Sequence, residues 1–147
     1  MRTLETDRLI LRPFTLDDAE GLYAYASHPE VGPPAGWAPH KDPAESRRVI
    51  ETIFLPADTL AVVRRADGRL IGSAGFVGKH RTELGEPSEE VGYSLARDCW
   101  GQGLIPEAVE AILRHAFGEL GYAAIWAAYY DGNRKSKRVV QKCGMTY

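Results

Sequence analysis

The chain has 147 residues, a formal net charge of −2 at pH 7, 44% apolar residues and 26% charged residues. This size and composition predict a single globular domain over residues 1–147, and the weak net charge argues against nucleic acid or an anionic membrane as the main partner. Two cysteines and four histidines without paired spacing argue against a disulfide framework and predict no metal site.

The pattern of the N-terminal residues is not that expected of a signal peptide, and it predicts a strand followed by a helix. Charges at Arg2 and Glu5 interrupt any leader-like apolar run, and no stretch is long enough to span a membrane, so we expect a cytoplasmic protein with reduced cysteines. Residues 8–12 alternate as a strand does, and Pro13 ends it. The following helix has Thr15 as its N-cap and an apolar face made of Ala19, Leu22, Tyr23 and Ala26.

A loop rich in proline and glycine, residues 29–40, separates this helix from a second one. Trp37 in this loop either plugs the core or forms one wall of a substrate pocket. Asp42, Pro43 and Glu45 together predict a strong helix start. The apolar face of that helix is expected at Val49, Ile50, Ile53 and Phe54.

A β-hairpin is predicted next, with strands over residues 59–66 and 70–77. Asp67 and Gly68 between them are a typical turn pair. Gly72 and Gly75 lie inside the second strand, where glycine is unfavourable unless a backbone or a ligand approaches closely. Residues 79–88 are polar and predict a mobile loop.

The central stretch predicts a strand, a glycine-rich turn and a helix in immediate succession. The strand covers residues 91–95, and Pro106 and Glu107 are expected to open the helix. Its apolar face is expected at Val109, Ile112, Leu113, Ala116, Phe117 and Leu120, with Gly121 as the stop. A helix start preceded by glycines can hold a phosphate, because its first N–H groups lack intrahelical partners. The sequence fits neither the Walker loop nor the dinucleotide fingerprint, and a plain turn without a ligand is the alternative.

The remaining residues predict a buried strand over 123–130, a helix over 136–143 ended by Gly144, and the start of one more strand. Hairpins followed by a β-α-β unit predict a fold that combines helices and strands, an α/β fold in the broad sense with the mixed sheet of an α+β protein. Its sheet would be mixed and mostly antiparallel, with helices on both faces.

Three ordered motifs resemble those of the GNAT N-acetyltransferases, and most closely the branch of ribosomal-protein-alanine acetyltransferases. The first is Leu4-Glu5-Thr6-Asp7-Arg8-Leu9-Ile10-Leu11-Arg12-Pro13. The second is Trp100-Gly101-Gln102-Gly103-Leu104 with Pro106-Glu107-Ala108. The third runs from Asn133 to Met145 and contains the Asn-x-x-Ser pattern at Asn133 and Ser136. The resemblance covers essentially the whole chain.

The resemblance implies acetyl-CoA as co-substrate, entering a gap between two splayed strands near Val91 and Ile125. A bulge at Gly92 would free an amide for the acetyl oxyanion. Asn133 would hold the pantetheine amide. The pantetheine arm would pair along Tyr93, Ser94 and Leu95. The pyrophosphate would lie on the loop made of Trp100, Gly101, Gln102, Gly103, Leu104 and Ile105. Trp100 stands where relatives often carry Arg or Gln, and Ile105 is expected to crowd the loop, since relatives often carry a small residue there.

Acetyl transfer needs a base for the ammonium, a donor for the oxyanion and an acid for the leaving thiolate. Glu89 and Glu90 are the candidate bases, with Glu90 preferred; an ordinary solvated pair is the alternative. Ser136 is the candidate acid and a second cofactor contact, Tyr130 is held in reserve, and a helix cap is the alternative for Asn133 and Ser136. A basic cluster would attract the 3′-phosphate or simply form a solvated face: Arg134, Lys135, Lys137, Arg138 and Lys142.

The leading hypothesis is therefore an acetyl-CoA-dependent N-acetyltransferase without a metal. Its acceptor would be a primary amine on a protein N-terminus or a small molecule, and residues 33–41 would shape the acceptor pocket. A homodimer is an open option. A non-catalytic acyl-CoA-binding or regulatory module is the main alternative, and an unrelated α/β scaffold is a weaker one. Relatives usually continue into a final hairpin, so its absence after Tyr147 implies a truncated acceptor wall or a wall supplied by a partner.

Overall fold

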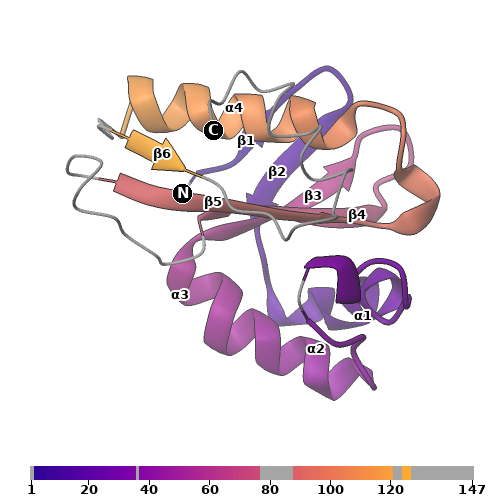
Figure 1. Cartoon of the computed structure of the whole chain (residues 1–147). Coiled ribbons are helices and arrows are strands. Elements are labelled where there is room, and N and C mark those ends of the chain that lie inside the picture. The colour runs from indigo at the N-terminus through magenta and orange to yellow at the C-terminus, as the bar shows by residue number, and fades with distance from the viewer. Residues whose placement is uncertain (1, 36, 77–87, 121–123, 127–147) are drawn as a thin grey trace.

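The computed structural model describes residues 2–35, 37–76, 88–120 and 124–126, which form a six-stranded sheet with helices on both faces (Figure 1). The strands follow chain order across the sheet: β1 (Leu4–Glu5), β2 (Leu9–Pro13), β3 (Thr59–Arg64), β4 (Leu70–Phe76), β5 (Ser88–Leu95) and β6 (Ala124–Trp126). Neighbours pair antiparallel, except that β5 and β6 run parallel. The predicted mixed, mostly antiparallel sheet is confirmed.

The helices fall into two layers (Figure 1). One layer holds α1 (Ala19–Ala26), α2 (Pro43–Val49) and α3 (Leu55–Ala57), and the opposite layer holds α4 (Leu104–Gly118). Shorter turns of helix connect them: η1 (Leu16–Asp18), η2 (Pro33–Ala35), η3 (Ile50–Phe54) and η5 (Arg97–Cys99). The helix and final strand predicted after residue 130 lie outside the described residues. No helix in the described ranges has the length and apolar character needed to cross a membrane.

The second helix begins where the sequence predicts but loses its regular period. The Asp42 carboxylate accepts a hydrogen bond from the Glu45 N–H at 2.7 Å and so caps α2. A π-helical turn, η3, then follows directly. The wider turn rotates the residues after Ile50 relative to a regular helix. Ile50 is therefore fully buried, whereas Ile53, predicted on the same face, is 51% exposed.

Helix α1 buries a different tyrosine from the predicted one. Leu22, Tyr25 and Ala26 face the core, while Tyr23 is only half-buried. Both tyrosines lie at helical spacing from Leu22 or Ala26, so periodicity alone does not separate them. The prediction for Tyr23 is wrong, and the buried tyrosine lies against β5.

The predicted hairpin of β3 and β4 is confirmed, although β3 ends at Arg64. Gly68 has a left-handed φ of +70°, as its turn requires. The glycine prediction also holds at Gly72, because a Cβ there would lie 2.3 Å from the Ser94 carbonyl oxygen on β5. Close approach of two backbones therefore explains a glycine inside the strand.

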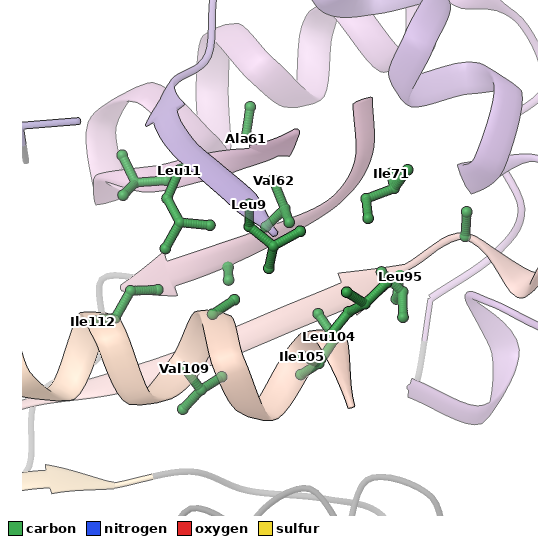
Figure 2. Packing of buried hydrophobic residues seen from close by; sticks show 14 of the residues in the cluster. Leu9, Leu11, Ala61, Val62, Ile71, Leu95, Leu104, Ile105, Val109 and Ile112 are labelled. Carbon is green, nitrogen blue, oxygen red and sulfur yellow. The ribbon is translucent and has the colours of Figure 1, made fainter. Parts of the chain in front are cut away.

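Helix α4 packs a stripe of apolar side chains onto the sheet (Figure 2). Leu9, Leu11 and Val62 lie on the facing side of the strands. The stripe follows spacings of three and four residues and contains Leu104, Ile105, Ala108, Val109, Ile112 and Ala116. Phe117 and Leu120, predicted on this face, are 49% and 42% exposed. Phe117 is the next residue after Ala116, so its side chain points to a different side of the helix from the stripe. Leu120 lies beyond the helix end at Gly118.

Candidate functional site

The turn between β5 and α4 has a backbone that glycine adopts most readily. Gly101 has a φ of +82° and Gly103 a φ of +75°, both in the left-handed region. No atom lies within 4 Å of a Cβ built at Gly101. Backbone conformation rather than crowding therefore favours glycine there, and the predicted strand, glycine turn and helix are confirmed.

Helix α4 begins at Leu104, two positions before the predicted start at Pro106. Its N-cap is Gly103, and the Glu107 N–H makes the first intrahelical bond, to the Gly103 carbonyl at 3.3 Å. The first turn of a helix forms no such bonds, so proline fits at its third position as well as at its first. Within the described ranges, the N–H groups from Gly101 to Ile105 donate to no protein acceptor. They remain available to an anion.

The apolar side chains of the loop pack against the rest of the protein. Leu104 and Ile105 are 3% and 4% exposed and pack beside Leu95 in the core (Figure 2). Ile105 therefore does not crowd the loop, contrary to the prediction. The Trp100 ring nitrogen donates to the Leu95 carbonyl at 2.9 Å, and the Arg97 guanidinium stacks 4.5 Å from the Trp100 ring centroid. Trp100 thus fastens the loop to the end of β5.

Strand β5 presents alternate backbone groups to its two edges. The Ala96 N–H donates to the Ile71 carbonyl at 2.7 Å, at the end of the β4–β5 ladder. By alternation, the backbone of Ser94 also faces β4, whereas that of Tyr93 and Leu95 faces the opposite edge. In the described part of the chain, β6 pairs with that edge at Ser88–Glu90. Of the predicted pantetheine contacts, Tyr93 and Leu95 thus lie on the suitable edge and Ser94 does not.

The bulge predicted at Gly92 is not present in the β4–β5 ladder. The register is continuous from Phe76↔Val91 to Gly72↔Leu95. The irregularity lies instead one ladder away, between Val62 and Val63 of β3. The regular alternation of backbone N–H groups along β5 therefore directs the amides of Tyr93 and Leu95 to the edge opposite β4, and no inserted residue is needed.

Glu90 and Ser94 lie on the same face of β5, because they are four positions apart and side chains alternate between the faces of a strand. Ser94 contacts Tyr25 of α1, so this is the face covered by α1, α2 and α3. Glu90 is 9% exposed, a strong burial for a carboxylate. The burial of Glu90 argues against an ordinary solvated pair.

A chain of three hydroxyls, two of them buried and that of Ser94 partly buried, crosses from α1 to the sheet. The Tyr25 hydroxyl lies 3.0 Å from Ser94 Oγ, which lies 2.7 Å from Ser73 Oγ. Tyr25 is 3% exposed. Burial raises the pKa of Tyr25 to about 12, although both serine hydroxyls favour its ionised form. The network fixes α1 against β4 and β5 at the level of Ser94, and sequence reasoning missed it.

Tyr25→Phe is expected to lower the free energy of unfolding by about 1 kcal/mol at pH 7, because one buried hydrogen bond is lost. The pKa of Tyr25 in the folded protein is raised from 10.0 to about 12. The phenol therefore contributes its full share to the free energy of unfolding below about pH 10, and this share is lost as the pH rises towards about 12. Urea unfolding at neutral pH and near pH 11 should show the gap between wild type and variant closing. Tyr23→Phe, two residues earlier, is the control. An unchanged gap would contradict this expectation.

Trp37 packs as a plug. A Cβ at Gly32 would meet the Trp37 ring at 2.5 Å, and the Trp37 and His40 ring centroids are 5.4 Å apart. Trp37 also packs partly buried against the core. Of the two interpretations, the core plug fits this packing better than an open pocket wall.

Several predicted site residues lie outside the described ranges: Tyr130, Asn133, Ser136 and the basic cluster of Arg134, Lys135, Lys137, Arg138 and Lys142. Their roles stay predictions. Among the described residues, no three His, Cys, Asp or Glu side chains gather as a metal site would require.

Comparison with known proteins gives a consistent picture. Residues 8–146 match the family described as the acetyltransferase (GNAT) domain. The chain is 30% identical over 145 residues to the uncharacterized N-acetyltransferase p20 of Bacillus licheniformis, covering 95% of this chain and 80% of that protein.

Solved structures share the fold. An acetyltransferase of the GNAT family from Bacillus anthracis superposes with a TM-score of 0.86 at 24% identity, covering 98% of this chain and 83% of that one. The ribosomal-protein-S5-alanine acetyltransferase from Vibrio fischeri superposes with a TM-score of 0.76 at 21% identity, covering 98% and 82%.

Proposed function

The chain belongs to the GNAT acetyltransferases, and from this premise we propose that it acetylates a primary amine by direct attack of that amine on acetyl-CoA. Membership of the family makes it an acetyl-CoA-dependent N-acetyltransferase. One observation of the site carries the proposal: the unpaired amides from Gly101 to Ile105 lie directly after the β5 edge that carries Tyr93 and Leu95.

These amides suit a diphosphate. The start of α4 adds the partial positive charge of its helix dipole, about half an elementary charge. Because Leu104 and Ile105 direct their side chains into the core, an anion can approach their N–H groups closely. Leu104, Ile105 and Gly103 would hold the phosphates, with Gly101 and Gln102 completing the cradle.

The pantetheine arm would then lie along β5 as an added strand, pairing with the backbone of Tyr93 and Leu95. An amide on this edge, from Val91 or Tyr93, would donate to the acetyl carbonyl as it becomes an oxyanion. The attacking nitrogen forms the new C–N bond, and the tetrahedral intermediate collapses as the C–S bond breaks. The electron pair leaves with sulfur, which is protonated to the free thiol.

Two proton transfers accompany this exchange. Both kinds of acceptor amine are mostly protonated at neutral pH, since the pKa is about 8 for a protein N-terminus and near 10 for an aliphatic amine. Glu90 would accept the proton, directly or through water, from the face of β5 covered by α1. Ser136 would donate a hydrogen bond to the departing sulfur, with Tyr130 as the second candidate. Asn133 would hold the pantetheine amide.

The acceptor is proposed to be the amino group of a protein N-terminus, or otherwise a small-molecule amine. The likeness to the ribosomal-protein-S5-alanine acetyltransferase supports the first choice. A cytoplasmic location belongs to the same proposal. The buried free thiol of Cys99 is consistent with a reducing compartment.

Titration calorimetry followed by a thiol-release screen tests the proposal. Acetyl-CoA should bind, and free thiol should appear with one class among unblocked peptides, amino acids, polyamines and aminoglycosides. Peptides of the same sequence with an acetylated N-terminus are the matched control and should release none. Binding without release from any amine would instead identify an acyl-CoA-binding module. No heat at millimolar acetyl-CoA would contradict the proposal itself.

A further inference from the structure

The turn between β1 and β2 is bonded to the glycine loop, 94 residues further along the chain. The Arg8 side chain donates from Nε to Glu107 Oε1 at 2.8 Å and from Nη1 to the Gln102 carbonyl at 2.9 Å. The Arg8 backbone N–H donates to Glu107 Oε2 at 3.1 Å, and Thr6 Oγ1 donates to the same oxygen. One guanidinium therefore joins the loop to the first turn of α4.

The carboxylate that anchors this guanidinium is itself well held. Desolvation disfavours the charged form of Glu107, but the hydrogen bonds from Thr6 and Arg8 outweigh it and lower the pKa of the carboxyl. The Glu107 side chain is 21% exposed and that of Arg8 is 48% exposed. Glu107 thus fixes the Nε side of the Arg8 guanidinium, and Nη1 of the same group holds the Gln102 carbonyl.

The bond to the Gln102 carbonyl also sets the direction of an amide. In a planar trans peptide, the carbonyl of one residue and the N–H of the next point in opposite directions. Because Arg8 holds the Gln102 carbonyl on its own side, the Gly103 N–H points to the other side of the loop. Gly103 is one of the residues whose amide has no protein acceptor in the described ranges.

We propose that Arg8, anchored by Glu107 and Thr6, is a positioning residue that locks the Gln102–Gly103 peptide with its N–H towards the bound diphosphate. This inference rests on the proposed coenzyme site. Gly103 itself permits more than one backbone conformation, so the peptide can reverse without side-chain strain. The reversed peptide would turn the Gln102 carbonyl oxygen, a partial negative charge, towards the phosphates and remove one donor.

Arg8→Ala is expected to weaken coenzyme A binding by roughly 10- to 100-fold, as the loss of one hydrogen bond to a charged group would. Arg8→Lys keeps the charge but cannot reach two acceptors as a planar fork does, so it should restore only part of the affinity. Glu107→Gln should weaken binding in the same direction. Arg2→Ala is the matched control, because Arg2 pairs with Glu119 at 2.5 Å just beyond the other end of α4.

The experiment measures coenzyme A affinity by calorimetry on all five proteins and records the Gly103 amide resonance by ¹H–¹⁵N NMR. Wild type and Arg2→Ala should give one sharp Gly103 signal that shifts on binding. Arg8→Ala should give a broadened or displaced signal before ligand is added, with a thermal midpoint close to that of Arg2→Ala. If Arg8→Ala does not fold, Arg8→Lys and Glu107→Gln carry the same test.

Each result has a distinct meaning. Wild type without coenzyme A binding would contradict the proposed function. Normal binding by wild type and equally by the Arg8 variants, with an unchanged Gly103 resonance, would overturn only the positioning role. Full recovery by Arg8→Lys would also overturn it, because charge alone would then suffice.

Discussion

Gly103→Asp is expected to reduce coenzyme A affinity by about three orders of magnitude. The substitution places a carboxylate at the N-cap of α4, beside the amides proposed to hold the diphosphate. Two like unit charges about 4 Å apart repel by roughly 4 kcal/mol at an effective dielectric constant of about 20, which corresponds to about a 1000-fold weaker complex. Calorimetry with coenzyme A measures the effect.

Gly68→Asp supplies the matched control for Gly103→Asp. Gly68 also has a left-handed φ, +70°, and no atom lies within 4 Å of a Cβ built there. Both variants should therefore lose a similar, small stability, about 1 kcal/mol, from the unfavourable backbone region. Only Gly103→Asp should lose coenzyme binding. Equal affinity in the two variants would show that the loop does not hold the anion.

Glu90→Gln is expected to lower the rate of acetyl transfer by about 10²- to 10⁴-fold, the usual contribution of a positioned general base. Coenzyme A affinity should stay within about twofold of wild type, because the amide cradle does not involve this side chain. The free-amine fraction rises about tenfold per pH unit below the pKa of the amine, which is about 8 for a protein N-terminus and near 10 for an aliphatic amine. The variant should therefore recover activity more steeply than wild type as the pH rises towards that pKa.

Glu89→Gln is the control for Glu90→Gln, because alternation along a strand lets only one of two neighbouring carboxylates point at the cleft. It should retain most of the activity in the same thiol-release assay. A fully active Glu90→Gln together with an inactive Glu89→Gln would reverse the assignment of the base. Full activity in both variants would mean that neither carboxylate accepts the proton.

Local signals predicted the elements that depend on local chemistry. The cap at Asp42, the turn at Gly68 and the glycine loop before α4 each follow from a few neighbouring residues, and the structure contains them. The predicted start of α4 lies two positions too late, because Pro106 fits the third position of a helix as well as its first. Errors of two positions arise where two places in a helix satisfy the same backbone constraint.

Other features required tertiary information. The π-helical turn of η3 exposes Ile53, and no sequence periodicity signals it. Tyr25 is chosen over Tyr23 by its contact with Ser94, which is 69 residues away. The bond from Arg8 to Gln102 spans 94 residues. Pairings of this kind depend on which strands become neighbours, and local patterns do not encode that choice.

The most direct test is a crystal structure of the protein grown with excess acetyl-CoA. We expect the diphosphate within hydrogen-bond distance of the amides from Gly101 to Ile105, and the pantetheine arm alongside Tyr93 and Leu95 of β5. Coenzyme bound elsewhere, or electron density absent from this loop at saturating acetyl-CoA, would contradict the assignment.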